Sequence, residues 1–298
     1  MIVAHATLDH ATGCVASLRG DLPPDRIIVV LNDPTSVEDD AMAGLRHRCV
    51  VISPSSPQGY GANLNLGVRS LGQDVDCLLL ANDDVVFPAG ALASLVDALS
   101  DPNVGIAGPT VIWGDGKSTQ PGYGLPRVLE AFNPQGIVLP RPLWEAFQER
   151  TRRAGPEAVI TAVPGAAMVV RRAAFEAVGG FDEDFFLYWE ETDLCYRLAR
   201  AGWRLAWAEK AVVTHLGGSS IASDRSQALS AQSLALYFKK RVGRFRWIVL
   251  TCVFLAVFAL SGLYAAGASL ARPSTAARRL ELLRSWWRGQ LFFLPRRV

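Results

Sequence analysis

The chain has 298 residues, of which half are hydrophobic and 19% are charged, and its formal net charge is +2. This composition excludes a disordered or fibrous chain, and the length excludes a small disulfide-stapled protein and allows one large domain or two smaller ones. The charge is uneven, because residues 231–298 contain 12 Lys and Arg but a single acid, Glu281. An acidic body with a basic tail argues against binding of nucleic acid and favours contact of the tail with anionic lipid.

The first two thirds of the chain alternates short aliphatic runs with helix-like patterns, which predicts an α/β fold with a mainly parallel sheet flanked by helices. The expected strands are Met1–Ala4, Ile27–Leu31, Cys49–Ile52, Cys77–Leu80, Val104–Val111 and Val163–Arg171, and the expected helices are Thr12–Arg19, Asp39–Arg46, Ala62–Leu71, Ala89–Leu99, Ala173–Val178 and Glu190–Ala201. The strands are almost continuously aliphatic, as expected when helices cover both faces of the sheet. Residues 113–160 are rich in Gly and Pro, and we expect loops there with a short helix.

The spacing of the cysteines and the first residues of the chain indicate a cytosolic protein. Five cysteines, Cys14, Cys49, Cys77, Cys195 and Cys252, are widely spaced without a Cys-x-x-Cys pair. We therefore expect reduced thiols in a cytosolic protein. The apolar run at residues 1–4 is too short for a secretory leader and has no basic residues before it.

The first candidate site follows the expected strand Cys77–Leu80, where the chain continues as Asn82-Asp83-Asp84. In an open α/β sheet ligands bind beyond the carboxyl ends of the strands, so these side chains are expected to face a ligand crevice. Adjacent carboxylates suit Mg²⁺ or Mn²⁺ bridging a diphosphate. The alternative is a simple acidic turn before Pro88.

The second candidate site joins an aromatic run, Phe185-Phe186-Leu187-Tyr188-Trp189, to three acids in the first turn of a helix. The helix dipole favours ionised carboxylates there, and an ionised carboxylate beside an apolar wall can act as a general base. The alternative is a structural pair between Asp193 and Arg197, four residues apart on the helix. That pair leaves Glu190 and Glu191 unexplained.

The third candidate is His215, which follows the apolar run Ala211-Val212-Val213 and precedes Gly217-Gly218. A single histidine in this position is more often structural than a metal ligand. Its role as a ligand requires that it meet Asp84 in space, because imidazole and carboxylate together make a good site for a transition metal.

The C-terminal part contains 23 consecutive uncharged residues, 248–270, with basic groups on both sides. This is long enough to cross a bilayer, but a simple span would place one basic group against the positive-inside tendency. A helix lying in the interface, or a re-entrant hairpin, would keep both groups on one side, and the Trp, Leu and Arg pattern of residues 280–292 is typical of an interfacial amphipathic helix. The alternative is a buried helix of the domain core.

The order of these motifs resembles that of the family 2 inverting glycosyltransferases. The resemblance rests on Asn82-Asp83-Asp84, Pro164-Gly165-Ala166-Ala167-Met168-Val169-Val170-Arg171-Arg172, Gly179-Gly180-Phe181-Asp182-Glu183, Trp189-Glu190-Glu191-Thr192-Asp193, Gly202-Trp203 and His215. Within that family the chain looks most like the bacterial rhamnosyltransferases and galactofuranosyltransferases of cell-envelope glycan assembly. The resemblance implies a GT-A glycosyltransferase domain at residues 1–220 and a helical, membrane-associating region at residues 221–298.

The resemblance also implies roles for individual residues. Asp84 and His215 would bind a Mn²⁺ or Mg²⁺ ion on the donor diphosphate, and Glu191, the second acid of the pair, would be the catalytic base. Donor or nucleotide contacts would come from Asn32, Asp33, Gly59, Tyr60, Asn65, Asn82 and Asp83, and acceptor contacts from Gly165, Trp189 and Glu190. Leu31 stands where the family often has a base-recognising aspartate, which leaves Asn32 or Asp33 as substitutes. The acidic pair is Glu-Glu where Glu-Asp or Asp-Asp is commoner in the family.

The expected reaction is therefore a single displacement that moves a rhamnose-like or other hexosyl unit from a dTDP- or UDP-sugar to a glycan or polyprenyl-linked acceptor. Residues 235–293 would dock the enzyme, as a peripheral or monotopic protein, on the cytoplasmic face of the cell membrane. Two alternatives remain at this stage. One is a sugar nucleotidyltransferase, although His5-Ala6-Thr7-Leu8-Asp9 lacks the phosphate loop that such an enzyme would have after its first strand. The other is a catalytically inactive scaffold that recruits partners to the membrane.

Overall fold

The computed structural model describes residues 1–4, 8–18, 20–33, 39–72, 74–119, 122–123, 160–217, 223–242 and 252. Its chain contacts divide it into two compact units, residues 1–122 with 159–220 and residues 123–158 with 221–298. Each unit is treated by itself below, and the first carries the candidate active site.

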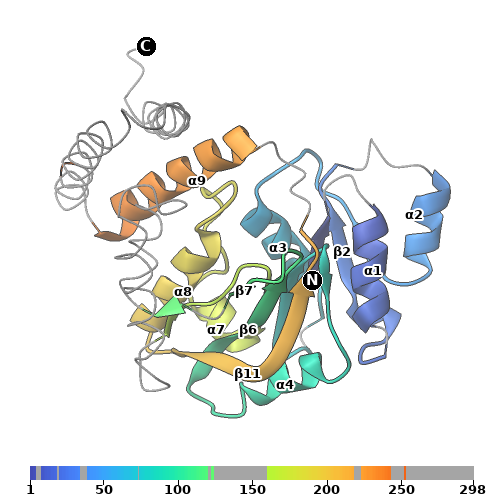
Figure 1. Cartoon of the computed structure of the whole chain (residues 1–298), viewed down its shortest axis with the longest axis horizontal. Coiled ribbons are helices and arrows are strands. Elements are labelled where there is room, and N and C mark those ends of the chain that lie inside the picture. Colours follow the sequence, from blue (N-terminus) through green and yellow to red (C-terminus); the bar gives the residue numbers. More distant parts are fainter. Residues whose placement is uncertain are drawn as a thin grey trace, which may run out of the picture. The chain divides into compact units, whose positions relative to one another are not determined.

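The elements alternate between strands and helices over most of the first unit (Figure 1). Its strands are β1 (Ile2–Ala4), β2 (Ile28–Leu31), β3 (Val50–Ile52), β4 (Cys77–Asn82), β5 (Val85–Val86), β6 (Val104–Trp113), β7 (Ser118–Thr119), β9 (Ile160–Ala162), β10 (Ala167–Arg171) and β11 (Arg204–His215), and β8 (Gly122–Tyr123) lies at the boundary between the units. Its helices are α1 (Leu8–Leu18), the 3₁₀ turn η1 (Pro24–Arg26), α2 (Asp39–Arg46), α3 (Tyr60–Arg69), α4 (Ala91–Asp97), α7 (Arg172–Ala177) and α8 (Glu190–Arg200).

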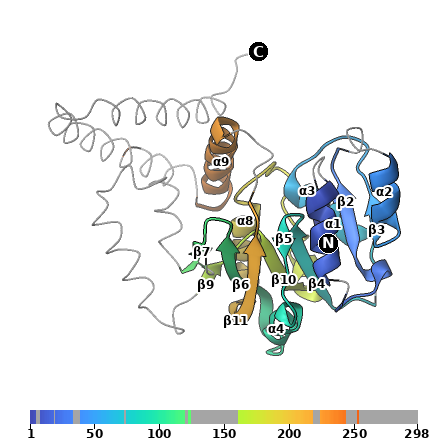
Figure 2. The same cartoon turned by 45° about the vertical axis from the view of Figure 1, so that its right-hand side comes forward.

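The central sheet has the strand order β3-β2-β1-β4-β10-β6-β11-β5, with β7 paired to β6 (Figure 2). The first four strands are parallel, as the sequence predicts. The expectation of a mainly parallel sheet also holds for β6 and β11, which pair parallel, but β10 runs antiparallel to both of its neighbours and β5 runs antiparallel to β11. The fold is therefore an α/β fold with a mixed sheet.

Helices cover both faces of this sheet, which explains why its strands are so uniformly aliphatic. Alternate residues of each strand enter two separate hydrophobic clusters, so Ile2 lies in one and Val3 in the other. The first cluster includes buried side chains of α1, α2 and α4, and the second includes those of α3, α7 and α8. The sheet is thus the middle of three layers, and the loops at its edges carry the polar groups.

The expected strand Val163–Arg171 is shorter in the structure. β9 ends at Ala162 and β10 begins at Ala167, and residues 163–166 form a turn between them. Gly108 on β6 accommodates this turn, because an added Cβ would lie 2.7 Å from Val163 Cβ and 2.9 Å from Pro164 Cδ. Sequence periodicity missed the break because Val163 and Ala166 are as buried and apolar as the strand residues around them.

The second unit contains α9 (Ser223–Tyr237), followed by one π-helical turn, η4 (Phe238–Val242). Except for Cys252, the uncharged stretch 248–270 and the amphipathic pattern after it lie outside the described residues. Among the residues that the structure describes, none of the helices combines the length and hydropathy that crossing a bilayer requires. All five cysteines are free thiols.

Candidate active site

Strand pairing brings Asp84 and His215 together. Asn82 ends β4 and Val85 begins β5, so Asp83 and Asp84 form the tight turn between these strands, where such residues are favoured. β5 pairs antiparallel with the end of β11, with His215 opposite Val85, and the backbone N–H of Leu216 donates to the carbonyl oxygen of Asp84 at 2.9 Å. As a result His215 Nε2 lies 3.2 Å from Asp84 Oδ1 and 3.2 Å from Asn82 Nδ2.

This pair of side chains fits a divalent cation. Burial lowers the pKa of His215 although Asp84 opposes the shift, so the imidazole is neutral and keeps a nitrogen lone pair. In an octahedral site with ligands at about 2.1 Å, neighbouring ligand atoms are about 3 Å apart, close to the separation of His215 Nε2 and Asp84 Oδ1. In the described part of the chain no group of three or more His, Cys, Asp or Glu side chains is arranged around a common point.

Two acids begin α8, where the helix dipole favours negative charge. Glu190 and Glu191 are both buried, and Thr192 Oγ1 donates to Glu191 Oε1 at 3.3 Å. Before them, Tyr188 and Trp189 both have positive φ angles, 68° and 70°. Non-glycine residues adopt this left-handed backbone at a cost of about 1–2 kcal/mol each, so the turn that orients the acids is strained.

Asp193 has a different role from these two acids. Its side chain is fully buried, and Arg197 Nε donates to Asp193 Oδ2 at 2.7 Å. Arg197 Nη1 also donates to the carbonyl oxygen of Val178 at 2.7 Å. The structural pair expected for Asp193 and Arg197 is therefore confirmed, and it ties α8 to the segment after α7.

The turn of residues 163–166 connects the two acidic groups. The backbone N–H of Asn82 donates to the carbonyl oxygen of Ala166 at 3.0 Å. On the other side, a Cβ added to Gly165 would lie 3.3 Å from Glu191 Cγ and Cδ and 3.6 Å from its Oε2. Because Gly165 has no side chain, the turn lies directly against the Glu191 side chain. The same turn bonds through Ala166 to Asn82, the residue before Asp83 and Asp84.

Tyr60, the first residue of α3, also contacts this turn. Its hydroxyl donates to the carbonyl oxygen of Gly165 at 3.4 Å. Burial raises the pKa of Tyr60 well above its usual value, and four carboxylates add to the shift. These carboxylates belong to Glu190, Glu191, Asp83 and Asp84. The phenol thus lies within electrostatic range of both acidic groups.

Side-chain amides organise the loop before α3. Asn32 follows β2, and its amide makes a two-way pair with Gln58, donating to the carbonyl oxygen at 3.0 Å and accepting from the backbone N–H at 2.9 Å. Gln58 Nε2 donates to Asn63 Oδ1 at 3.1 Å, and Asn63 is fully buried. The donor-binding role predicted for Asn32 stays a prediction, and the bonds of its amide within the chain hold the 54–59 loop to the end of β2.

Asn65 and Gly59 also make close contacts within the chain. Asn65 Oδ1 accepts from the backbone N–H of Phe181 at 2.9 Å, and its Nδ2 donates to the Phe181 carbonyl oxygen at 3.0 Å and to Glu183 Oε1 at 2.9 Å. At Gly59 a Cβ would lie 2.7 Å from the carbonyl oxygen of Phe186 and 2.8 Å from that of Phe185. Donor contacts remain predictions for both residues. Their observed contacts join α3 to the segment that leads into α8.

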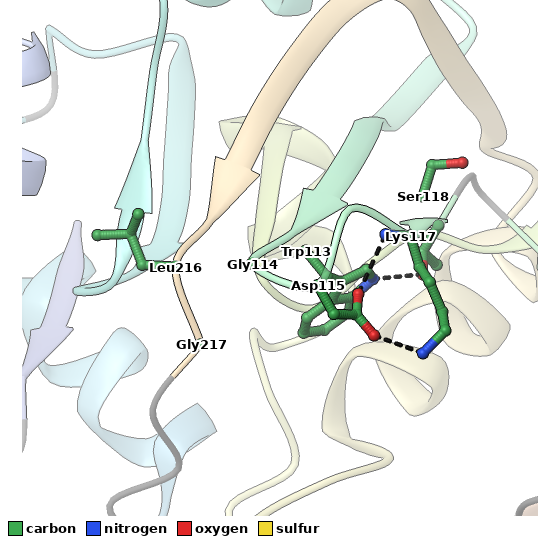
Figure 3. A pocket seen from close by; sticks show the side chains of 8 residues that line it. Trp113, Gly114, Asp115, Lys117, Ser118, Leu216 and Gly217 are labelled. Carbon is green, nitrogen blue, oxygen red and sulfur yellow. Dashed lines mark hydrogen bonds and ion pairs between the residues drawn. The ribbon is translucent and has the colours of Figure 1, made fainter.

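A hollow of about 580 Å³ opens at Trp113 and Leu216 (Figure 3). It is lined by the hairpin that joins β6 to β7 and by the end of β11, namely Trp113, Gly114, Asp115, Lys117, Ser118, Thr119, Leu216 and Gly217. The Trp113 ring packs against the imidazole of His215 with centroids 4.5 Å apart, and its Nε1 donates to Thr119 Oγ1 at 2.7 Å. Figure 3 also shows the ion pair of Lys117 with Asp115 at the rim.

The structure therefore gathers six of the predicted residues around the 163–166 turn and the ends of β4 and β11. Asn82, Asp84, His215, Glu191, Gly165 and Tyr60 are connected there by contacts given above. The sequence pattern alone did not single out Trp113 as a site residue. Trp113 ends a long apolar strand, which could have indicated a side chain at the sheet edge, but residues 113–160 gave no further pattern.

Comparison with known proteins gives a consistent result. The profile of the family described as glycosyltransferase like family 2 matches residues 14–248. The N-acetylglucosaminyl-diphospho-decaprenol L-rhamnosyltransferase of Mycobacterium tuberculosis is 30% identical over 250 residues, which cover 79% of this chain and 81% of that protein. The pre-mycofactocin glycosyltransferase of the same species is 30% identical over 205 residues, covering 67% of this chain and 38% of that protein.

Two solved structures with similar folds bear the names of sugar-transferring enzymes or their ligands. The mannosyltransferase PcManGT of Pyrobaculum calidifontis, in complex with GDP-Man and Mn²⁺, has a TM-score of 0.64 and 15% identity and covers 98% of this chain and 86% of its own. The structure of GalNAc-T7 with UDP, GalNAc and Mn²⁺ has a TM-score of 0.53 and 17% identity. The match covers 78% of this chain and 46% of the GalNAc-T7 chain. At these identities the likeness shows the fold, which is of the GT-A type.

Proposed function

Because the chain belongs to glycosyltransferase family 2, we propose that it transfers a rhamnose-like or other hexosyl unit, with inversion, from a nucleotide-sugar to a lipid-linked or polysaccharide acceptor. The activity named for the mycobacterial relative, L-rhamnosyl transfer to a diphospho-decaprenol-linked sugar, supports this choice of sugar and acceptor. The observation that carries the proposal is the 163–166 turn, which bonds to Asn82 on one side and lies against Glu191 on the other.

In the proposed reaction Glu191 is the general base. Its carboxylate takes the proton from the acceptor hydroxyl while that oxygen forms a bond to the anomeric carbon. The bond from this carbon to the diphosphate oxygen breaks on the opposite face, its electron pair leaves with the nucleoside diphosphate, and the configuration inverts. Positioning of donor and acceptor lowers the barrier further, since two correctly held reactants behave as one molecule.

Asp84 Oδ1 and His215 Nε2 are the proposed ligands of a divalent cation, which would neutralise the charge that develops on the departing diphosphate. One imidazole nitrogen beside one carboxylate favours Mn²⁺ over Mg²⁺, because Mg²⁺ prefers oxygen ligands. Asn82 and Asp83 stand next to this pair and are the proposed contacts to the sugar-nucleotide.

We also propose that the basic, apolar region at residues 235–293 docks the enzyme on the cytoplasmic face of the cell membrane, where a polyprenyl-linked acceptor would be found. Lys239 and Lys240, at the start of this region, are exposed. Removal of residues 243–298 is expected to shift the protein from the membrane fraction to the soluble fraction. A full chain that is already soluble in the absence of detergent would contradict this.

The test of the enzymatic proposal is the substitution Glu191→Gln, which keeps size and hydrogen bonding but removes the base. Release of nucleoside diphosphate from a panel of dTDP- and UDP-sugars, with Mn²⁺ and a membrane lipid extract, is expected to fall by about 10²–10⁴-fold. Glu209→Gln, an exposed glutamate of β11, is the matched control and should keep full activity. Wild-type activity in the Glu191→Gln protein would overturn the assignment.

The same assay separates the two other classes of function. A scaffold would bind no nucleotide in the presence of Mn²⁺ and would release none. A nucleotidyltransferase would release no nucleoside diphosphate from these donors, and would instead release inorganic diphosphate when given a nucleoside triphosphate and a sugar phosphate. Asp84→Asn and His215→Gln are each expected to weaken Mn²⁺-dependent nucleotide binding by about 10- to 100-fold, measured by titration calorimetry.

A further inference from the structure

We infer that Tyr60 is a positioning residue for the base: its hydroxyl holds the Gly165 carbonyl and so fixes the 163–166 turn against the Glu191 side chain. The inference rests on the proposed function, since it assigns a role in the same site. It moves Tyr60 from the donor-binding set, where sequence resemblance puts it, to the support of the base.

The first support is that Tyr60 bonds to two segments of the chain that are connected to Glu191. Its backbone N–H donates to the carbonyl oxygen of Phe186 at 2.8 Å, in the aromatic run that leads into α8. Its hydroxyl donates to the carbonyl oxygen of Gly165 at 3.4 Å. The start of α3 therefore bonds both to the turn that lies against the Glu191 side chain and to the segment that leads into α8.

The second support is the tight contact at Gly165. The site of its missing Cβ is 3.3 Å from Glu191 Cγ and Cδ, so a small shift of the turn would change the position of the carboxylate. Other contacts of this turn include the close approach of Gly108 to Val163 and Pro164 and the bond from Asn82 to Ala166. None of these restrains the Gly165 carbonyl itself, whose hydrogen bond to Tyr60 does.

The third support is that the hydroxyl stays protonated. Burial and the carboxylates of Glu190 and Glu191 on α8 and of Asp83 and Asp84 on the β4–β5 turn all raise the pKa of Tyr60. The phenol therefore remains a hydrogen-bond donor across the working pH range and is poorly suited to accept a proton from the acceptor. A neutral, fixed donor is what a positioning role requires.

The experiment is Tyr60→Phe, which keeps the ring and the backbone bond and removes only the hydroxyl. We expect kcat to fall by about three- to tenfold, the range of one neutral hydrogen bond, with the donor KM unchanged within about twofold. Tyr196→Phe, which removes a hydroxyl from α8 itself, is the matched control and should leave both parameters unchanged. An unchanged kcat, or a raised donor KM with normal kcat, would overturn the inference, the second by indicating a donor contact.

A second background tests whether the hydroxyl acts through Glu191. Glu191→Asp draws the carboxylate back by about one methylene and away from Gly165. In that background Tyr60→Phe is expected to change kcat by less than about twofold, because the turn no longer sets the carboxylate. An equal loss in both backgrounds would contradict positioning of the base.

If Tyr60→Phe fails to unfold cooperatively, Gly165→Ala is used instead, because it changes the contact between the turn and Glu191 directly. The added methyl would press on Glu191 Cγ and Cδ and is expected to lower kcat with little change in the donor KM, and full kcat would refute the role of the turn. Failure of the proposed function looks different, because then the wild type would not transfer sugar or Glu191→Gln would be fully active.

Discussion

Gly59→Ala is expected to destabilise the fold and to lower activity together. The backbone at Gly59 is extended, with φ −67° and ψ 161°, so alanine is acceptable in conformation. The obstacle is space, because the new Cβ would lie 2.7 Å from the carbonyl oxygen of Phe186, 2.8 Å from that of Phe185 and 2.9 Å from the Phe186 Cα. All three contacts are backbone atoms, which cannot turn aside as a flexible side chain does.

The magnitude follows from these contacts. Inserting one methyl into a packed position costs about 1–3 kcal/mol when neighbours have to shift. At roughly 2–4 °C per kcal/mol for a domain of this size, the thermal midpoint should fall by about 2–12 °C. The Phe185–Phe186 segment, which would have to move, leads into Glu190 and Glu191. The hydrogen bond from Tyr60 to Phe186 would lengthen as this segment moves, so kcat should fall as well.

The assay is urea unfolding followed by tryptophan fluorescence, together with the nucleoside diphosphate release assay. Gly13→Ala is the matched control, since Gly13 lies exposed in the middle of α1 with no atom within 4 Å of its added Cβ. It should raise the free energy of unfolding by about 0.5–1 kcal/mol. If Gly59→Ala is as stable as the wild type and fully active, the close packing of the α3 loop on the Phe185–Phe186 backbone is not what positions the acids.

Three further outcomes follow from single residues. Tyr188→Gly relieves one left-handed residue and should raise the free energy of unfolding in urea by about 0.5–1 kcal/mol; a loss of stability would mean that the side chain outweighs the strain. Burial lowers the pKa of His215, so the unfolded chain binds the proton first and stability should decline as pH falls through about 6.5; unfolding titrations of His215→Gln should lack this slope. Burial raises the pKa of Cys14 to about 12, so iodoacetamide at pH 8 should modify exposed Cys252 and spare Cys14 until urea is added, as read by peptide mass mapping.

The sequence predicted the parallel half of the sheet well because its physical signal is strong. Strands such as Ile28–Leu31 are aliphatic at every position, and helices cover both of their faces. It did not indicate that β10 runs antiparallel to its neighbours. A strand pattern gives burial but not direction, and β10 is as aliphatic as its parallel neighbours although it runs the other way.

The sequence suggested that Asp84 and His215 meet, but it did not contain enough information to establish the contact. The contact depends on the two-residue strand β5, which is too short to produce a period, and on β11, whose register along β6 shifts twice before it reaches His215. Only the pairing of Val85 with His215 brings the two side chains to 3.2 Å. The residue types suggested a metal site, and the sheet register supplied the geometry.

The asparagines around the loop before α3 show a second limit of prediction from sequence. Asn32, Asn63 and Asn65 look alike in sequence, as polar residues among small and apolar ones. In the structure Asn32 and Asn63 hold the loop before α3 and Asn65 holds the Phe181 backbone. A buried amide that satisfies backbone groups and an amide that binds a ligand have the same composition and the same spacing, so only the hydrogen-bond partners distinguish them.

The partners of the three acids in the first turn of α8 also decide which of them suits the role of base. Asp193 is fully buried and its carboxylate is ion-paired with Arg197, so it is already engaged within the chain. Of the two that remain, Glu191 is the one whose side chain lies against the 163–166 turn, and the neighbouring carbonyl of that turn bonds to Asn82, two residues before Asp84. A base must be near the carbon that loses the diphosphate, and among these acids Glu191 has that connection through contacts that the structure gives.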